Sequence, residues 1–340
     1  MIRFGIAGIP LTSKGRTFVD SVEDSNNLGL NALEVQLLRV NVEDRPALDY
    51  AGKTPRDIEE SIVVNVMRMD DSGNYRNVGV DTVIEEDDIV QELFWNMARN
   101  YDEIAEGGAL AKELDVQLSL HAPYYMDLLE DGELAEKSYN HLKWSLIIGK
   151  GMGAKRVVTH TGFVRGSRKA NLDRAVSVFS RISKEFSPKD KFPYVSVETS
   201  GKSEIFGSTA DVMHLAKKVK DIEPIINFPH IHSVTGGSMR EVKDFDTVIS
   251  EFAKMSKGDL YAEFAGVEYQ DENEVKLTAI KHGDLKFETL AEYMVDYAGE
   301  STLISMSPLL EHDAQYMQVI LLRAYSRKIQ KRQIAKKQVA

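Results

Sequence analysis

Four short segments of this sequence each resemble a buried strand that ends in a side chain able to bind a metal ion. The four side chains are His121, His160, Glu198 and His230. Imidazole nitrogens and carboxylate oxygens are the donors that zinc and related divalent ions take in proteins. Strand ends at one rim of a (β/α)8 barrel converge on one pocket, so the pattern predicts a metal site there. The segments are 116–121, 155–160, 194–198 and 224–230.

Glu198 is the central residue of this prediction. A glutamate at the end of an apolar strand is costly to bury as an unpaired charge, and a divalent cation removes that cost. His121 and His160 stand at the corresponding positions of the two preceding segments. The structural alternative is a carboxylate that hydrogen-bonds one of these imidazoles without a metal. The repeated placement on three successive segments favours the metal.

The fourth segment and the one after it extend the candidate set. Asn227 can offer its amide carbonyl oxygen to a cation, and Glu263 lies in the next apolar segment. His230 and His232 are two residues apart, so an extended backbone would place them on the same side. Met306 follows the last segment and is expected to pack rather than to bind a hard cation.

Alternating strand and helix patterns are the sequence sign of parallel βαβ units, and they run along most of this chain. Helical spacing of apolar residues is clear over 135–150 and 172–186. Gly29, Gly153 and Gly299 stand near predicted helix ends, where a positive φ is often needed. We therefore predict a single TIM-barrel domain over 1–340. Its eight predicted strands are 3–8, 32–37, 116–121, 156–160, 194–198, 224–228, 259–265 and 301–305.

One stretch, at about 43–92, does not follow the alternation. Two β-rich runs, 62–69 and 78–84, flank a turn-forming cluster at 70–74, which predicts a β-hairpin-like insertion after the second strand. A loop that follows a barrel strand emerges on the catalytic side. The insertion could be a lid, a substrate-selecting wall or a subunit contact, and we favour the lid or the subunit contact.

Composition and charge restrict the class of protein. The 340 residues are 43% hydrophobic and 28% charged and include no cysteine, so a thiolate metal site is excluded. The net charge is −11, but residues 43–92 hold 14 acidic and 5 basic side chains. The rest is close to neutral, so a nucleic-acid partner is not excluded. No apolar run is long enough for a membrane helix, and we expect a cytoplasmic protein without a membrane partner.

The C-terminal part, at about 314–340, has the opposite charge. No acidic residue follows Asp313, while seven basic residues do. A solvated helix end that complements its own dipole is the favoured interpretation, and a tail that binds phosphate is the alternative. The basic residues are Arg323, Arg327, Lys328, Lys331, Arg332, Lys336 and Lys337.

The strand-end motifs resemble those of endonuclease IV, the metal-dependent apurinic/apyrimidinic (AP) endonuclease of the xylose-isomerase-like barrel superfamily. The start of the chain, Ile-Ala-Gly-Ile-Pro-Leu, together with Glu-Val-Gln at 34–36, is similar to archaeal endonuclease IV-related proteins. The resemblance covers nearly the whole chain except the insertion. The motifs are His-Ala-Pro-Tyr at 121–124, Val-Val-Thr-His-Thr-Gly-Phe at 157–163, Val-Glu-Thr-Ser-Gly-Lys at 197–202 and Asn-Phe-Pro-His at 227–230.

This resemblance implies a fold, an activity and roles for residues. His121 and His160 would bind a first zinc ion, Glu198 would bridge two ions as the catalytic carboxylate, and His230 would serve a third ion. Tyr124 would lie near the substrate phosphate. The implied cofactor is zinc, with manganese as an alternative, at one to three ions per chain. The implied reaction is cleavage of damaged DNA on the 5′ side of an abasic site.

The sequence also departs from the family pattern. Asn227 stands in place of an aspartate, Glu263 in place of a histidine and Met306 in place of a glutamate. His232 or His282 could enter the ligand set instead. Three functions are therefore kept: an AP endonuclease in DNA repair, a metal-dependent sugar isomerase or epimerase, and a non-catalytic relative that binds through a residual site. The nuclease is favoured because both histidines are retained and a strand-eight glutamate is not.

Overall fold

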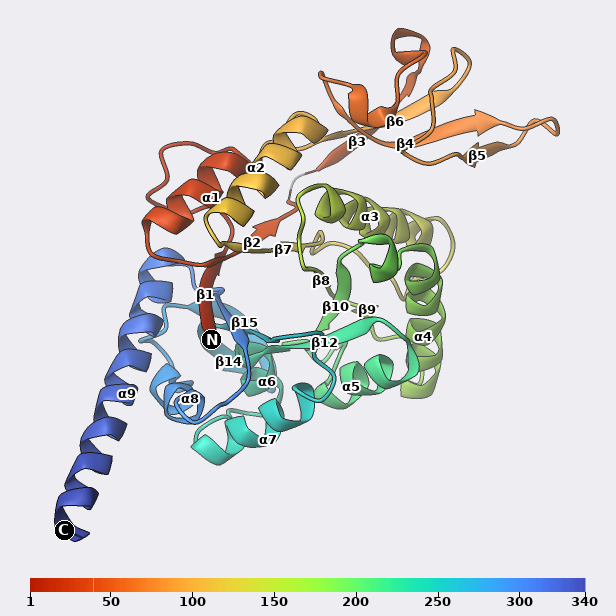
Figure 1. Ribbon diagram of the computed structural model, residues 1–340. Coiled ribbons are helices and arrows are strands. Elements are labelled where there is room, and N and C mark those ends of the chain that lie inside the picture. Colours follow the sequence, from red (N-terminus) through yellow and green to blue (C-terminus); the bar gives the residue numbers. More distant parts are fainter. Residues whose placement is uncertain (39, 340) are drawn as a thin grey trace.

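Eight parallel strands close into a barrel in this computed structural model, which describes residues 1–38 and 40–339 (Figure 1). The side chains of 336–339 lie outside the described part, as do residues 39 and 340. The strands follow one another around the barrel in chain order, and the last pairs with the first. They are β1 (Ile2–Ala7), β2 (Ala32–Gln36), β7 (Gln117–His121), β8 (Arg156–Thr159), β10 (Tyr194–Glu198), β12 (Ile222–Asn227), β13 (Leu260–Phe264) and β16 (Ser301–Ser305).

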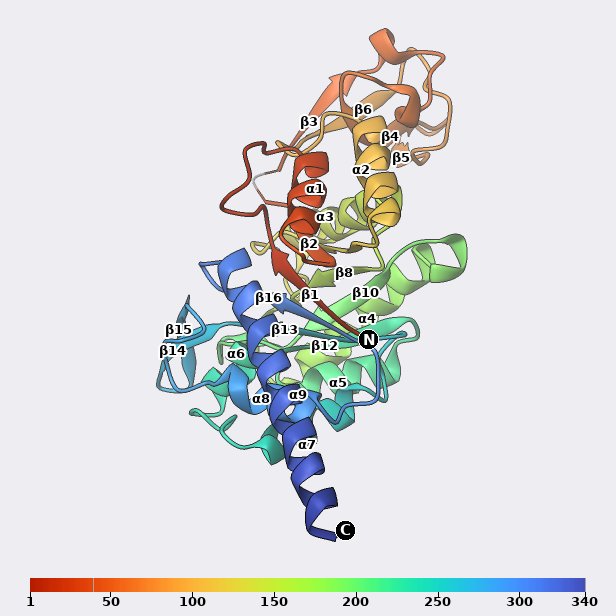
Figure 2. The same cartoon turned by 60° about the vertical axis from the view of Figure 1, so that its left-hand side comes forward.

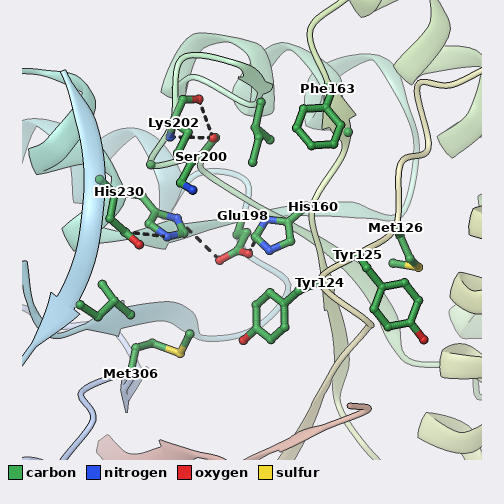
Figure 3. A pocket seen from close by; sticks show the side chains of 15 residues that line it. Tyr124, Tyr125, Met126, His160, Phe163, Glu198, Ser200, Lys202, His230 and Met306 are labelled. Atoms are coloured by element: carbon green, nitrogen blue, oxygen red, sulfur yellow. Dashed lines mark hydrogen bonds and ion pairs between the residues drawn. The ribbon is translucent and has the colours of Figure 1, made fainter. Parts of the chain in front are cut away.

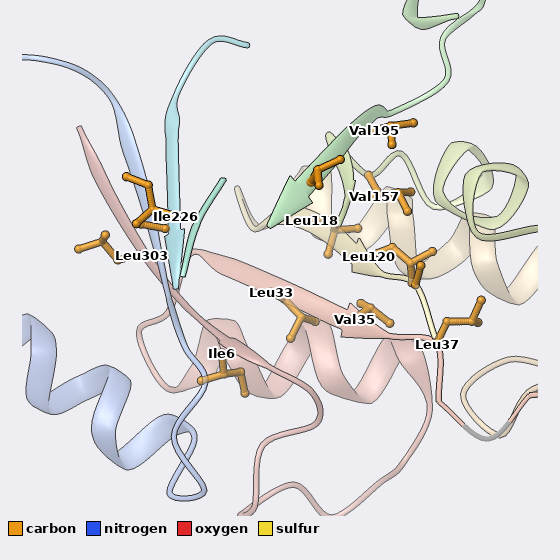
Figure 4. Close-up of a cluster of buried hydrophobic side chains, with 14 of the residues drawn as sticks. Ile6, Leu33, Val35, Leu37, Leu118, Leu120, Val157, Val195, Ile226 and Leu303 are labelled. Atoms are coloured by element: carbon orange, nitrogen blue, oxygen red, sulfur yellow. The ribbon is translucent and has the colours of Figure 1, made fainter. Parts of the chain in front are cut away.

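The predicted TIM barrel is confirmed, and each strand lies within two residues of its predicted bounds. The local reason is that strands of a parallel barrel are buried on both faces and so appear as short apolar runs. Leu118, Leu120, Val157 and Val195, for example, belong to one buried cluster that neighbouring strands share (Figure 4). This cluster holds the strands in register, so that their carboxyl ends form one rim.

Helices surround the barrel (Figure 1). The predicted helical run 135–150 falls inside α3, and 172–186 falls in α4 except for its last residue. Gly29 and Gly153 follow the ends of α1 and α3, and both have a positive φ (76° and 69°), as predicted. Gly299 has no positive φ, so that part of the prediction is wrong. The helices are α1 (Phe18–Asn27), α2 (Tyr101–Glu113), α3 (Gly132–Gly151), α4 (Arg168–Glu185), α5 (Thr209–Lys218), α6 (Phe228–Val234), α7 (Val242–Phe252), α8 (Phe287–Met294) and α9 (Glu311–Val339), with the 3₁₀ helix η3 (Pro188–Asp190).

The insertion after β2 is a four-stranded antiparallel sheet that projects from the barrel beside α2 (Figures 1 and 2). It buries its own apolar cluster, which includes Val63, Val66, Ile84 and Val90. The predicted hairpin has its first arm and turn as expected, but its second arm is β5 rather than 78–84. The sheet contains β3 (Asn41–Pro46), β4 (Ile62–Met69), β5 (Tyr75–Asn77) and β6 (Ile89–Phe94), with the 3₁₀ helices η1 (Leu48–Tyr50) and η2 (Pro55–Asp57).

Two small antiparallel ladders stand on the rim of the barrel. One pairs the loop after β8 with the loop after β10, and the other is a hairpin that follows β13. Because barrel loops at this end carry the chemistry, these ladders can shape the walls of a site. They are β9 (Gly162–Phe163) with β11 (Ile205–Phe206), and β14 (Gly266–Gln270) with β15 (Asn273–Thr278).

A buried ionic network fills the opposite, amino-terminal end of the barrel. Arg156 is fully buried, and its guanidinium donates to Glu223 (3.0 Å) and Asp259 (2.7 Å). The same guanidinium lies 4.4 Å from the ring centroid of Tyr261. Such a charge is tolerated in a core only when it is paired and hydrogen-bonded. The network therefore closes the barrel below the rim where the candidate site lies.

Helix α9 runs from the rim toward that amino-terminal end. Gln315 and Gln318 donate to the carbonyl oxygens of Leu28 and Gly29, which stand directly before β2. The helix continues about 30 Å past these contacts, at 1.5 Å per residue, so its basic end lies on the far side from the rim. Among the described residues, the structure offers no helix that is both long and apolar enough to cross a membrane.

Candidate metal centre

The three residues at the ends of β7, β8 and β10 meet inside the barrel rim. Oε1 of Glu198 lies 2.7 Å from Nδ1 of His160 (Figure 3). The same oxygen lies 3.3 Å from Nε2 of His121. One potential ligand atom from each residue lies within 4.8 Å of the others. This is the predicted first metal site, and two imidazoles with one carboxylate match a donor set that zinc accepts.

Additional contacts orient His121 within this cluster. Nδ1 of His121 lies 2.6 Å from the carbonyl oxygen of Ala122, which leaves Nε2 to face Glu198. The ring of Tyr124 stacks on His121 with 4.1 Å between centroids and 22° between planes. A second nitrogen that bonds to the backbone fixes the direction of a ligating imidazole. His121 is therefore held in the orientation that a metal ligand needs.

The electrostatics of the cluster keep its central carboxylate charged. Burial acts to raise the pKa of Glu198, but the imidazoles of His160 and His121 outweigh it and hold that pKa well below its ordinary value. Burial acts to lower the pKa of His121, but the hydrogen bond and charge of Glu198 outweigh it and raise that pKa. Without a metal, the ionised carboxylate and a histidine form an ion pair, which is the alternative that the sequence left open.

The two residues predicted from the following strands lie beside this cluster. The amide nitrogen of Asn227 donates to Oε2 of Glu263 (2.7 Å) and to Oε2 of Glu198 (3.3 Å). Its amide oxygen accepts from the main-chain nitrogen of His230 (3.1 Å), where it caps α6. In this arrangement Asn227 is a donor that joins two carboxylates, rather than a carbonyl directed at a cation. Glu263 points into the barrel and is fully buried.

His230 lines the same pocket but lies farther from Glu198, with 4.0 Å between Nδ1 and Oε2. Its Nδ1 is 2.6 Å from the carbonyl oxygen of Thr199, and its Nε2 is 3.2 Å from Oε2 of Glu274. Glu274 was not predicted, because it belongs to the β14–β15 hairpin rather than to a barrel strand. A third metal at His230 would have to take Nε2 together with this carboxylate.

The extended backbone that would have placed His230 and His232 on the same side is not present. Residues 228–234 form α6 instead of an extended segment, so the two rings diverge. His232 is fully buried, and its Nε2 lies 2.9 Å from Oδ1 of Asp284, away from Glu198. His282 is exposed on the 279–283 turn. Neither histidine replaces a missing ligand.

Glu34 is a buried acidic residue of the site that the sequence prediction missed. It lies in the middle of β2, is fully buried, and accepts a 2.7 Å hydrogen bond from the hydroxyl of Tyr261 across the barrel. Burial raises the pKa of Glu34. Burial and the charges of Glu198 and Glu34 raise the pKa of Glu263 well above its ordinary value. Three carboxylates and two imidazoles thus share the interior of one rim.

A cavity of about 550 Å³ opens above the cluster, which is large enough for a small ligand. Tyr124 stands at its edge, and Gln36 donates to its hydroxyl (2.9 Å). Enclosure by the pocket and the charges of Glu34 and Glu198 raise the pKa of Tyr124 well above its ordinary value. Lys202 supplies a cation, while Met306 lies on the wall as packing (Figure 3).

Similar proteins share the fold of this chain. The family model described as "Xylose isomerase-like TIM barrel" matches residues 79–294. An uncharacterized protein of Methanocaldococcus jannaschii is 25% identical over 219 residues, which cover 62% of this chain and 78% of that protein.

Solved structures agree with this fold. Endonuclease IV from Thermus thermophilus superposes with a TM-score of 0.60 at 18% identity, over 96% of this chain and 99% of that one. D-psicose 3-epimerase from Clostridium cellulolyticum H10, solved with D-tagatose, superposes with a TM-score of 0.55 at 10% identity, over 94% and 99%. At such identities the likeness establishes the architecture alone, so the choice of chemistry depends on the residues of the site.

Proposed function

Because this chain belongs to the xylose isomerase-like TIM barrel family, we propose that it is a metal-dependent phosphodiesterase that cleaves DNA at AP sites. The convergence of His121 and His160 on one oxygen of Glu198 carries the proposal. Imidazole ligands suit zinc, with manganese as the alternative metal. The proposed partner is damaged DNA, and the proposed number of ions is one to three per chain.

In this proposal, different residues would bind the metal ion and the substrate phosphate. A bound divalent ion supplies Lewis-acid polarisation of a phosphoryl oxygen and stabilises the charge that develops in displacement. His121, His160 and Glu198 would hold it, and the lowered pKa of Glu198 keeps this carboxylate ionised at neutral pH. The raised pKa of Tyr124 keeps its hydroxyl protonated, so Tyr124 would donate a hydrogen bond to the phosphate. Lys202, on the pocket wall, would attract the phosphate charge.

The test is cleavage of a labelled duplex oligonucleotide that contains a single AP site, with metal-depleted protein and added Zn²⁺ or Mn²⁺. The proposal predicts a metal-dependent product with wild-type protein and none with Glu198→Gln. Glu92→Gln is a matched control, because Glu92 is equally buried but lies in the inserted sheet. Absence of product from wild-type protein with either metal would reject the proposal.

A sugar isomerase or epimerase is the second candidate, and one observation favours it. The cavity is a partly enclosed space of about 550 Å³, a size that fits a small molecule. Against this, Met306 stands where the sugar enzymes of this fold would need a strand-eight carboxylate for proton transfer. Incorporation of solvent deuterium at carbon in a panel of ketoses and aldoses would support the sugar reaction. Absence of deuterium incorporation in all of these sugars would reject the isomerase or epimerase function.

A further inference from the structure

The solvent side of helix α9 carries an exposed apolar stripe. Met317 and Leu321 lie on the opposite side of the helix and are buried against the barrel. Val319, Leu322 and Ile329 follow at intervals of three and seven residues, so they share one face, and their side chains are 42%, 65% and 55% exposed. A helix that covers a core is normally polar on its outer side. Apolar side chains gathered on that side therefore indicate a contact surface.

A row of basic side chains lies beside this stripe. Arg323, Arg327 and Lys331 follow one another at intervals of four residues, and all three are exposed. Arg323 and Arg327 line the same shallow groove as Leu322. Residues 319–335 contain five basic and no acidic side chains, so this part of the helix is positive throughout. The stripe and the row together are the basic helix face.

The inserted sheet carries a surface of the opposite charge. Side chains of two loop segments, such as Ile84, complete the buried cluster of this sheet, so 47–60 and 79–88 cover one of its faces. These segments hold nine acidic and two basic side chains. They also expose two large apolar side chains, Leu48 (63%) and Val83 (53%). We refer to the two segments as the acidic loop layer.

The two surfaces lie at opposite ends of the molecule (Figures 1 and 2), so they do not meet within one chain. The residues that line the cavity above the metal centre begin at Tyr124, so the insertion does not cover that cavity in this structure. Each surface combines exposed apolar side chains with charge of one sign, and the two signs are opposite. Such complementarity suits a contact between two copies of the chain, whereas two copies of α9 side by side would bring like charges together.

We propose that two copies of this chain form an antiparallel, two-fold dimer in which the basic helix face of each copy packs on the acidic loop layer of the other. Residues 319–335 form a strip about 25 Å long and about 10 Å wide. One contact would bury roughly 500 Å² on both partners, and two contacts would reach the roughly 1,000 Å² that a specific interface needs. A closed pair makes both contacts at once, so it is favoured over an open chain of copies.

The test is the molar mass of the full-length protein at low salt, measured by sedimentation equilibrium. It uses neither metal nor substrate, so its outcome does not depend on AP-site cleavage. Wild-type protein should dimerise, and added salt should weaken the dimer. The helix variant Arg323→Glu/Arg327→Glu/Lys331→Glu places acidic groups against the acidic loop layer. Its dimer dissociation constant should rise at least roughly tenfold.

A second variant reverses the other surface. Glu59→Lys/Glu60→Lys/Glu86→Lys/Asp87→Lys leaves the acidic loop layer with five acidic and six basic side chains. It should weaken the dimer as much as the helix variant does. An equal mixture of the two variants should dimerise again, because both contacts then join opposite charges. Recovery in the mixture also shows that both variants are folded.

A matched control reverses three exposed charges elsewhere. Lys217→Glu/Lys218→Glu/Lys220→Glu, in and after the last turn of α5, should dimerise as wild type does. A wild-type protein that stays monomeric at its highest soluble concentration would overturn the proposal, as would a mixture that stays monomeric or a mass that grows beyond two chains. A monomeric wild type that binds undamaged duplex DNA or anionic lipid vesicles through this helix would also overturn it, and would assign the helix to phosphate groups.

Discussion

Nδ1 of His160 lies 2.7 Å from Oε1 of Glu198, on strands that are neighbours in the barrel. His121 approaches the same oxygen, so one carboxylate atom of Glu198 contacts two imidazole rings. A metal at this point would take ligands from three successive barrel strands. Each ligand is fixed by a strand end rather than by a mobile loop, so the site is preorganised.

Removal of His160 should therefore remove the first metal. Loss of an outer-shell partner typically weakens metal binding 10–100-fold, so loss of a ligand in His160→Ala should cost at least roughly 100-fold in zinc affinity. Zinc at 100 times the wild-type Kd should stabilise wild-type protein by about 2.7 kcal/mol and the variant by at most about 0.4 kcal/mol. Zinc content and the zinc-dependent shift in Tm measure both effects. His214→Ala, outside the site on α5, is the control. Equal zinc content in the two variants would show that His160 is no ligand.

The metal-free protein should lose stability as the pH rises from 6 to 8.5. The pKa of His121 is raised in the folded state, so its contribution is complete below its unfolded value of about 6.5 and is lost as the pH rises through the folded pKa. The raised pKa values of Glu34 and Glu263 act in the same direction, because both must ionise in a buried place at higher pH. The lowered pKa of Glu198 preserves its own contribution until strongly acidic pH.

The measurement is Tm against pH for wild-type protein in chelator, beside Glu263→Gln. The variant cannot ionise at this position, so its curve should be flatter. Saturating zinc should also flatten the wild-type curve, because the metal replaces the protons of the site. Stability that does not change with pH in the metal-free wild type would contradict the assignment of these groups.

The barrel and the clustering of His121, His160 and Glu198 could be predicted from sequence because their signals are local. An apolar run predicts a barrel strand, and a polar side chain at its end, such as His121 or Glu198, is then predicted to lie at the rim. Glu34 had no such signal, since it lies inside β2 and its partner Tyr261 comes from a strand more than two hundred residues later. Glu34 meets Tyr261 only because the barrel closes, and the residues near Glu34 in the sequence carry no signal for that closure.

The helix at 228–234 could have been predicted, and this would have corrected the histidine pair. Asn227 is an N-cap residue, and Pro229 stands in the first turn, where a proline is favoured. The strand pattern before them led to the expectation of an extended backbone instead. In the insertion, Gly79 has a φ of 87° and ends the extended run that 78–84 was expected to form. Both errors come from giving hydrophobic periodicity more weight than turn and cap chemistry.

Replacement of Arg156 by alanine should destabilise the protein by about 3–5 kcal/mol, because it leaves two buried carboxylates without their partner. The side chain is fully buried between Glu223 and Asp259. Equilibrium unfolding in urea measures the loss. Arg99→Ala removes an exposed ion pair with Glu103 and should cost well under 1 kcal/mol. A loss of similar size in both variants would refute the structural role of the buried network.

Tyr124→Phe should lower kcat/KM for AP-site cleavage about tenfold and leave zinc content unchanged. The ring would still stack on His121, and only the hydroxyl proposed to donate to phosphate would be lost. One such hydrogen bond is worth about 1–1.5 kcal/mol, which corresponds to that factor. Kinetics with the abasic duplex and metal analysis of the same preparation measure the two quantities. A variant with wild-type kinetics would remove Tyr124 from substrate binding.

Reversal of the basic charges at Lys331 and Arg332 should leave AP-site cleavage within about twofold of wild type. The sequence left open a tail that binds phosphate, but α9 passes Leu28 near the amino-terminal end of the barrel and then continues away from the rim. Phosphate contacts at this end of α9 could not position a DNA strand over Glu198. Cleavage rates at low and moderate salt compare Lys331→Glu/Arg332→Glu with wild type. Because each phosphate contact steepens the salt dependence, a reduced slope in the variant would show that this helix end does meet the nucleic acid.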